Sequence, residues 1–156
     1  MSMAPRLKEY MNNHQVEYEV FTHPRTASSM ETVHVAHIPG ERLAKPVILE
    51  DDEGYVMAVL PANGRVHLGE LSRQMHRKLR LANELEVTRL FDDCAPGAIP
   101  PVGQAYGIET VMEETLAKQP DIFFEAGDHT ALIHLSAGQF MEMMAGVHRG
   151  HFIAPH

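Results

Sequence analysis

The spacing of apolar and polar residues predicts a chain in which helices and strands follow one another irregularly. Apolar residues recur at helical spacing over about 5–14, and the alternating segment VEYEVF (16–21) is typical of a strand. Two apolar runs, KPVILE (45–50) and YVMAVL (55–60), are joined by an acidic turn and predict a β-hairpin. Because both runs are nearly continuous rather than alternating, we expect both faces of this hairpin to be covered.

Capping pairs mark three helix starts, where serine or asparagine is followed three residues later by glutamate or glutamine. These pairs are Ser28 with Glu31, Asn83 with Glu86, and Ser136 with Gln139. The first helix should end near Pro39-Gly40 and the second near Phe91. A further helix is marked by apolar residues at helical spacing, namely Leu68, Leu71, Met75 and Leu79.

The second half of the chain begins with a long irregular segment. Residues 92–107, DDCAPGAIPPVGQAYG, are rich in glycine and proline and show no periodicity. After it we expect a strand near 108–112, a short helix near 113–118, and strands near 121–126 and 130–135 joined at Gly127-Asp128. The tail 147–156 is polar, and we expect it to be loose.

This order of elements predicts the fold class. Strands joined directly in pairs favour an α/β fold of the α+β type, with a mixed, largely antiparallel sheet or partly closed barrel and flanking helices. A length of 156 residues suits one domain, with its core at about 5–146. No GxGxxG follows the first strand and no GxxxxGK[ST] occurs, which argues against a dinucleotide or P-loop site.

Composition and charge restrict the partners. Hydrophobic residues make up 44% and charged residues 22%, an ordinary globular mixture. No apolar run approaches the roughly 20 residues of a membrane span, and the first residues do not resemble a secretory signal. We therefore expect a cytoplasmic protein without a membrane partner. A formal net charge of -8 argues against non-specific nucleic-acid binding, and DNA is not expected as a partner.

One segment runs against this acidic balance. Within residues 65–80, basic side chains outnumber the single acidic residue, Glu70. They could form a solvated helix face, or they could contact the phosphates of an RNA. The candidates for phosphate contact are Arg73, Arg77, Lys78 and Arg80.

Cysteine and histidine chemistry receive little support. Cys94 is the only cysteine, so an internal disulfide is impossible, and its acidic neighbours Asp92 and Asp93 disfavour a reactive thiolate. The chain has eleven histidines, including the spaced pairs at 34 and 37 and at 148 and 151. No HExxH pattern or closed zinc spacing occurs, so we expect neither a metal site nor a cofactor.

Three features could carry chemistry. Lys45 begins an apolar strand, where its ammonium could hold a phosphate or polarise an ester carbonyl, or simply extend to water. The loop GAIPPVGQ (97–104) could present backbone N–H groups to a ligand, or could be a stiff connector. His129 follows the Gly127-Asp128 turn and could project towards a substrate as an acid or base.

Three segments in the same order resemble the YbaK/prolyl-tRNA-synthetase-associated domain family. They are THPRTASSMETVHVAHIPGERLAKPVIL (22–49), GAIPPVGQAYGI (97–108) and FFEAGDHTALIHLSAGQF (123–140). The resemblance implies a compact mixed sheet or partly closed barrel, and trans-editing, which is hydrolysis of the ester that joins a wrong amino acid to tRNA. Two departures stand out: Pro46 after the lysine, and the Asp128-His129 pair. A proline there gives the strand no N–H, so this strand start should lie at an edge.

The resemblance also implies a site. The lysine of the family maps to Lys45 as the catalytic residue, its Gly-x-x-x-Pro loop maps to Gly97–Pro101, and its turn glycine maps to Gly127. The expected substrate-binding residues are Thr26, Gly97, Ala98, Ile99, Pro100, Pro101, Gly103, Gly127, Asp128 and His129. In this hypothesis Lys45 anchors the ester, N–H groups near 97–103 hold the adenosine and oxyanion, and the ribose 2′-hydroxyl assists the reaction.

The predicted function is therefore an aminoacyl-tRNA deacylase for a small amino acid, acting without a cofactor. Its partners would be the aminoacylated end of tRNA and an aminoacyl-tRNA synthetase. Three alternatives remain open at this point. The first is a non-catalytic binding module for an adenosine-bearing or aminoacylated ligand, and the second is a metal-dependent small-molecule hydrolase that uses the histidines. The third is a structural or regulatory domain.

Overall fold

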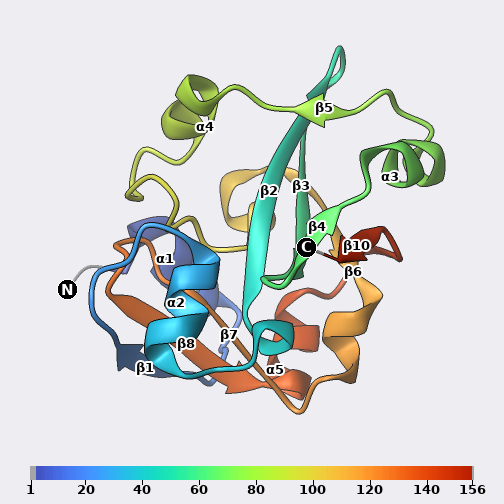
Figure 1. Cartoon of the computed structure of the whole chain (residues 1–156). Helices are drawn as coiled ribbons and strands as arrows, with labels where there is room; N and C mark the ends of the chain where they lie inside the picture. Colours follow the sequence, from blue (N-terminus) through green and yellow to red (C-terminus); the bar gives the residue numbers. More distant parts are fainter. Residues whose placement is uncertain (1–2, 156) are drawn as a thin grey trace.

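A computed structural model describes residues 3–155, and its elements form a mixed α/β fold that is not a closed barrel (Figure 1). The α-helices are α1 (Pro5–Asn13), α2 (Ser29–Ala36), α3 (Leu68–Met75), α4 (Glu84–Leu90) and α5 (Ala137–Met143). Three 3-10 helices are η1 (Gly40–Arg42), η2 (Gly103–Tyr106) and η3 (Glu114–Lys118). The predicted helical segments thus all contain helix, and the expected short helix at 113–118 is of the 3-10 type.

The strands of the described residues form three sheets. They are β1 (Glu19–Thr22), β2 (Ala44–Asp51), β3 (Gly54–Pro61), β4 (Gly64–Val66), β5 (Arg80–Leu81), β6 (Glu109–Glu113), β7 (Asp121–Glu125), β8 (Ala131–Ser136), β9 (His148–Gly150) and β10 (Ile153–Pro155). Their orders are β1-β8-β7, β10-β4 and β5-β2-β3-β6-β9. Among the strand pairs of the described residues, only β3–β6 and β6–β9 are parallel, and the isolated bridge between Leu43 and Phe123 is parallel as well. The predicted mixed, largely antiparallel arrangement is confirmed.

The predicted helix starts are confirmed by their caps. The side chain of Ser28 accepts a hydrogen bond from the amide of Glu31 at 3.2 Å, and Ser136 accepts one from Gln139 at 3.2 Å. Asn83 accepts from the amide of Leu85 at 2.7 Å. Each bond satisfies an amide that the first helical turn leaves unpaired.

Three predicted boundaries are wrong. The helix expected to end near Pro39-Gly40 ends at Ala36, because His37 takes a left-handed conformation with φ 56°. The helix marked by the apolar residues from 68 to 79 ends at Met75, because His76 takes a left-handed conformation with φ 55°. Leu79 is buried outside the helix and leads into β5. The first strand begins at Glu19 rather than at residue 16. The spacing of apolar residues does not predict where the backbone turns. The differences between the predicted and observed boundaries arise at such turns.

The prediction of a loose C-terminal tail is also wrong. β9 pairs in parallel with β6, and β10 pairs with β4, so residues 148–155 are held by the sheets. Phe152 is buried, and its amide donates to the Glu113 carboxylate at 2.7 Å. Strands of three residues leave little local signal, and their pairing partners are far away in the sequence.

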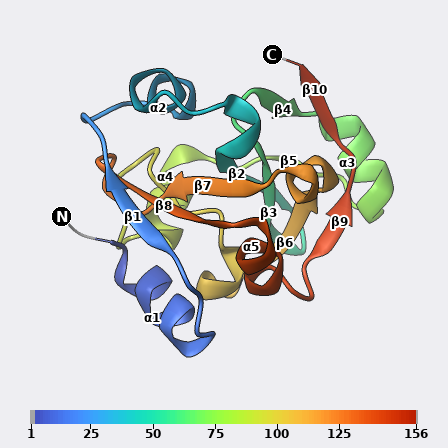
Figure 2. The same cartoon turned by 90° about the horizontal axis from the view of Figure 1, so that it is seen from below.

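The β2–β3 hairpin is covered on both faces, as predicted. Ile48 and Met57 pack in the larger apolar core, which lies against the β1-β8-β7 sheet, α1 and α5. Leu49 and Val56 pack in a second cluster with Leu71 of α3. In Figure 2, α1 and α2 flank the three-stranded sheet, while α3 and the C-terminal strands lie at the other end of the molecule.

One edge of β2 lacks a continuous neighbour. β3 pairs with every residue of β2, but β5 pairs only with Leu49 and Glu50. At the other end, Leu43 forms a bridge with Phe123 of β7. Pro46 lies between these two contacts, which confirms the expectation that this proline stands at a strand edge.

Candidate functional site

A cavity of about 280 Å³ lies against the unpaired edge of β2. Its lining residues come from three places in the sequence: Pro46, Val47 and Ile48 of β2; Leu81, Ala82, Glu84 and Val87 of the β5–α4 segment; and Gly97 and Ile99 of the predicted loop. The fold therefore brings the start of this loop next to the residue that follows Lys45.

Most of the loop lies inside the protein. Gly97 is exposed and has φ 81°, whereas Ala98–Gly103 are buried. At Gly103 a Cβ atom would lie 2.2 Å from Oγ1 of Thr110, so this glycine is needed for close packing against β6. Of the residues predicted to bind substrate here, Gly97 and Ile99 line the cavity, while Ala98, Pro100, Pro101 and Gly103 belong to the supporting core.

The predicted hairpin turn is attached to the same loop. The amide of Ala95 donates to the carbonyl of Gly127 at 2.7 Å, and the ring Nε2 of His129 contacts the carbonyl oxygen of Pro96. A Cβ at Gly97 would lie only 3.1 Å from Cε1 of His129. The structure thus brings Gly97, Gly127 and His129 together.

The other side chains of this turn have structural partners. Oδ1 of Asp128 accepts hydrogen bonds from the amides of Thr130 and Ala131 at 3.0 and 3.1 Å, which is Asx-turn chemistry. His129 is 6% exposed, and its Nδ1 has no hydrogen-bond partner among residues 3–155. Contact between His129 and a substrate therefore needs a movement of the turn.

A buried polar cluster behind the turn was not found from the sequence. The carboxylate of Glu125 accepts from Thr32 at 2.9 Å and lies 3.4 Å from Nε2 of His23. Burial raises the pKa of Glu125, and the bonds to Thr32 and His23 oppose that rise. The hydroxyl oxygens of Thr26 and Thr32 lie 2.6 Å apart. The hydroxyl of Thr26, which was predicted to contact substrate, is therefore hydrogen-bonded within this cluster. An acidic residue in an otherwise apolar strand was the only available signal.

Lys45 lies on the other face of β2. It is cross-strand partner of Leu60, and side chains alternate along a strand, so its Cβ points away from the face that carries Pro46 and Ile48. Its Nζ donates to the carbonyl of Ala62 at 3.1 Å, and burial lowers the pKa of this ammonium. Lys45 is not a lining residue of the cavity.

The predicted basic face is largely neutralised. Arg77 donates to both carboxylate oxygens of Asp51 at 2.6 and 2.7 Å and also reaches Glu109, so it ties α3 to the β2–β3 turn. The Arg77 guanidinium holds the pKa of Asp51 well below its usual range. Arg73 pairs with Glu70, and Arg80 lies 3.9 Å from both Glu50 and Asp52, while Lys78 is exposed. This geometry does not suit Arg77 for phosphate contact.

Cys94 has the environment of an inert thiol. Burial, with Asp93 beside it, raises the pKa of Cys94 to about 12, although the hydroxyl of Tyr106 opposes the rise. A thiol with this pKa is protonated at neutral pH and is a poor nucleophile. Within residues 3–155, no three or more His, Cys, Asp or Glu side chains are grouped to hold a metal ion.

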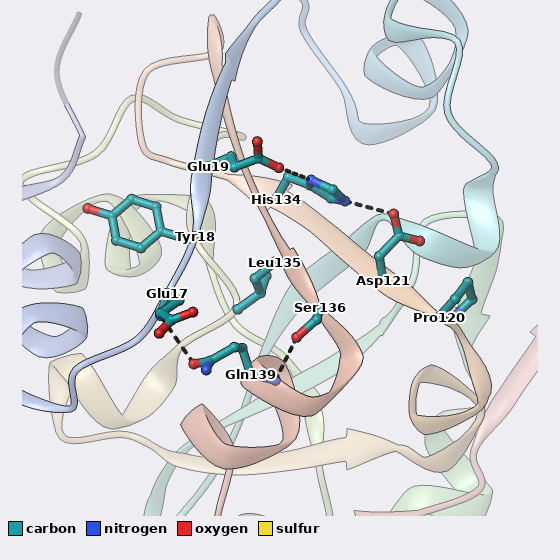
Figure 3. A pocket seen from close by; sticks show the side chains of 9 residues that line it. All are labelled: Glu17, Tyr18, Glu19, Pro120, Asp121, His134, Leu135, Ser136 and Gln139. Carbon is teal, nitrogen blue, oxygen red and sulfur yellow. Dashed lines mark hydrogen bonds and ion pairs between the residues drawn. The ribbon is translucent and has the colours of Figure 1, made fainter.

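A larger hollow lies elsewhere and contains none of the predicted residues. It measures about 490 Å³ and is lined by Glu17, Tyr18, Glu19, Pro120, Asp121, His134, Leu135, Ser136 and Gln139 (Figure 3). His134 links Glu19 and Asp121 at 3.1 and 2.7 Å. In these bonds Glu19, His134 and Asp121 are partners of one another.

Sequence comparison assigns the family. A family model described as "Aminoacyl-tRNA editing domain" matches residues 23–143, so this chain belongs to the aminoacyl-tRNA editing domain family. This range contains β2, the loop at 97–103 and the hairpin turn. None of the curated proteins matches the chain in sequence.

Solved structures show the same fold. The hypothetical protein APE2540 is 19% identical, with a TM-score of 0.84 over 96% of this chain and 99% of the other. A candidate trans-editing enzyme for prolyl-tRNA synthetase is 20% identical, with a TM-score of 0.82 over 99% of this chain and 98% of the other. A candidate signal transduction protein from Marinobacter aquaeolei VT8 is 20% identical, with a TM-score of 0.76 over 96% of this chain and 30% of the other. No helix in the described part is long and apolar enough to cross a membrane.

Proposed function

We propose that this protein is a trans-editing deacylase that hydrolyses the ester between a small amino acid and the 3′ end of a mischarged tRNA. The observation that carries the proposal is the cavity at the unpaired edge of β2, where Pro46 faces Gly97 and Ile99. Membership of the aminoacyl-tRNA editing domain family supplies the substrate class. The site needs no nucleophilic side chain, since an aminoacyl ester is already activated.

The edge position allows one ligand to reach both faces of β2. A nucleotide seated against Pro46 can pass its 3′ end around the unpaired edge towards Lys45. In this proposal the ammonium of Lys45, which donates to the carbonyl of Ala62 at 3.1 Å, anchors and polarises the ester carbonyl. The backbone amide of Gly97 itself, an exposed residue with φ 81°, donates to the developing oxyanion in this proposal, because Pro96 has no N–H and the amide of Ala98 already donates to the carbonyl of Ala95.

The reaction in this proposal is a simple hydrolysis. Water, oriented by the ribose 2′-hydroxyl, attacks the carbonyl carbon of the ester and forms a tetrahedral intermediate. The bond from that carbon to the ribose oxygen breaks, the ribose oxygen takes up a proton, and the free amino acid and tRNA leave. Lys45 and the Gly97 amide stabilise negative charge on the carbonyl oxygen and form no covalent bond.

The proposed preference for a small amino acid follows from the need for editing. A synthetase pocket discriminates a single methylene by only about 1–3 kcal/mol, so small residues are mischarged. We propose an aminoacyl-tRNA synthetase as a partner that releases such tRNAs, with both proteins acting in the cytoplasm. Arg73, Lys78 and Arg80 remain candidates for contact with the tRNA backbone.

The test is deacylation of tRNAs charged with alanine, cysteine, serine or proline, each measured with and without a chelator. Enzyme-dependent release of one or more of these amino acids, unaffected by chelator, is the expected result. Activity that disappears with chelator and returns with Zn²⁺ would support a metal-dependent hydrolase instead. Binding of an uncleavable aminoacyl-adenosine without turnover of any ester would support a binding module and contradict the proposal.

A further inference from the structure

We infer that the unpaired edge of β2 binds the adenine base of the terminal nucleotide, through the backbone carbonyl of Pro46 and the backbone amide of Ile48. The identity of the ligand rests on the proposed function. The two open backbone groups and the cavity in front of them follow from the pairing of β2 and the cavity lining, independently of the proposed function.

The direction of these groups follows from the hairpin register. Asp51 pairs with Gly54 across a two-residue turn, and in such a hairpin this closing pair exchanges hydrogen bonds. Along an antiparallel strand, successive residues point their N–H and C=O groups to opposite edges. The odd-numbered residues of β2 therefore bond to β3, and the even-numbered residues, including Pro46 and Ile48, point to the other edge.

Contacts at that edge agree with this direction. The amide of Ala82 donates to the carbonyl of Ile48 at 3.0 Å, which shows that the backbone of Ile48 faces the β5 side. After Ala82 the chain turns away into α4, and Leu43 is the next residue of this edge region with a strand contact. Within residues 3–155 the carbonyl of Pro46 and the amide of Ile48 have no hydrogen-bond partner.

These two groups form a matched acceptor and donor. They flank Val47 and point the same way, towards the cavity that Pro46, Val47 and Ile48 line. Pro46 contributes no N–H, so no additional donor competes at that position. Ile48 is 7% exposed, and an unpaired amide at so buried a residue is costly unless a ligand satisfies it.

Adenine carries the complementary pattern. Its amino group is a donor beside a ring nitrogen acceptor, so the amino group can donate to Pro46 while the ring nitrogen accepts from Ile48. The apolar side chains of Leu81, Val87 and Ile99 provide the walls for a flat ring. A peptide strand would need a longer row of free backbone groups, whereas only one such pair is open here.

The test is an NMR titration of the whole protein with an uncleavable probe, 3′-deoxy-3′-(alanylamino)adenosine. We expect the amide resonance of Ile48 to move downfield on binding. The same probe with unsubstituted purine in place of adenine should bind about three- to tenfold more weakly, because it lacks the amino donor. Leu81→Ala should weaken binding several-fold, and Leu85→Ala is the matched control, since Leu85 is also an exposed leucine but does not line the cavity.

Three outcomes would overturn the inference. They are binding with the Ile48 resonance unmoved, equal affinity for the adenine and purine probes, and no binding up to the solubility of the probe. The inference and the proposed function can fail separately. Deacylation with an unmoved Ile48 resonance would keep the function and remove the adenine site, whereas the Ile48 shift without deacylation of any tRNA would do the reverse.

Discussion

The amide of Ala82 donates to the carbonyl oxygen of Ile48 at 3.0 Å, and this bond marks the point where β5 leaves β2. Beyond it, β2 has an open edge at Pro46, and the loop that begins at Gly97 lies across the cavity. The site is therefore made by the separation of two strands, and the side chain of Lys45 leaves β2 on the face opposite to Pro46 and Ile48.

Replacing Lys45 tests the proposed reaction. Lys45→Ala should reduce the rate of deacylation by about a hundredfold or more, because loss of one contact to the developing oxyanion costs about 3–4 kcal/mol. Lys8→Ala, which removes an exposed lysine of α1, serves as the control. Full activity of Lys45→Ala with unchanged substrate affinity would show that the role given to Lys45 is wrong.

Substitution of two glycines can distinguish the cost of backbone strain from the cost of a steric contact between the loop and the turn. Gly97 and Gly107 have φ 81° and 68°, so alanine at either position costs about 1–2 kcal/mol in backbone conformation. Only at Gly97 would the new Cβ also meet His129, at 3.1 Å, since nothing lies within 4 Å at Gly107. We expect Gly97→Ala to lower the urea midpoint further than Gly107→Ala and to weaken probe binding. Equal effects of the two substitutions would refute the contact between the loop and the turn.

Arg77 should matter for stability rather than for RNA binding. It makes two hydrogen bonds to Asp51 and its side chain is 12% exposed, whereas the Arg73 side chain is 74% exposed. We expect Arg77→Ala to lower the melting temperature by several degrees and Arg73→Ala to leave it nearly unchanged. A melting temperature unaffected by Arg77→Ala would contradict the structural role.

The salt dependence of tRNA binding should become shallower with Arg73→Ala and Arg80→Ala together.

The contribution of the C-terminal segment to the stability of the fold should depend on pH. His151 Nδ1 lies 2.9 Å from the buried carboxylate of Glu113, which raises the pKa of His151 above its ordinary value of 6.5. A raised pKa means that the ion pair stabilises the fold fully below pH 6.5 and that this contribution is lost as the pH rises through the folded-state pKa. The stability difference between the native protein and His151→Gln should thus be larger at low pH.

Denaturation in urea at two pH values, one on each side of the transition, measures that difference. His148→Gln provides the control, because His148 is an exposed residue of the same C-terminal segment. A gap between the native protein and His151→Gln that stays constant with pH would exclude the ion pair as a contributor to stability.

Local signals in the sequence predicted the elements well where the physics is local. A cap needs a side chain and an amide two or three residues away, as at Ser28 and Ser136, and the β2–β3 hairpin needs only two apolar runs and a turn. Pro46 predicted a strand edge, because proline has no N–H to donate to a neighbouring strand. The resemblance of three ordered segments identified the family, which the match over residues 23–143 confirmed.

The tertiary structure decided which groups meet, since that depends on partners far apart in the chain. Arg77 looked like a free cation until the fold placed Asp51 beside it, and the polar tail became two strands because β6 and β4 had edges to pair with. The open backbone pair at Pro46 and Ile48 exists because β5 ends after two residues, and no local pattern records where a neighbouring strand stops. The sequence by itself determined the segments and their chemistry, whereas strand pairing at long range determined which of them are free to bind a substrate.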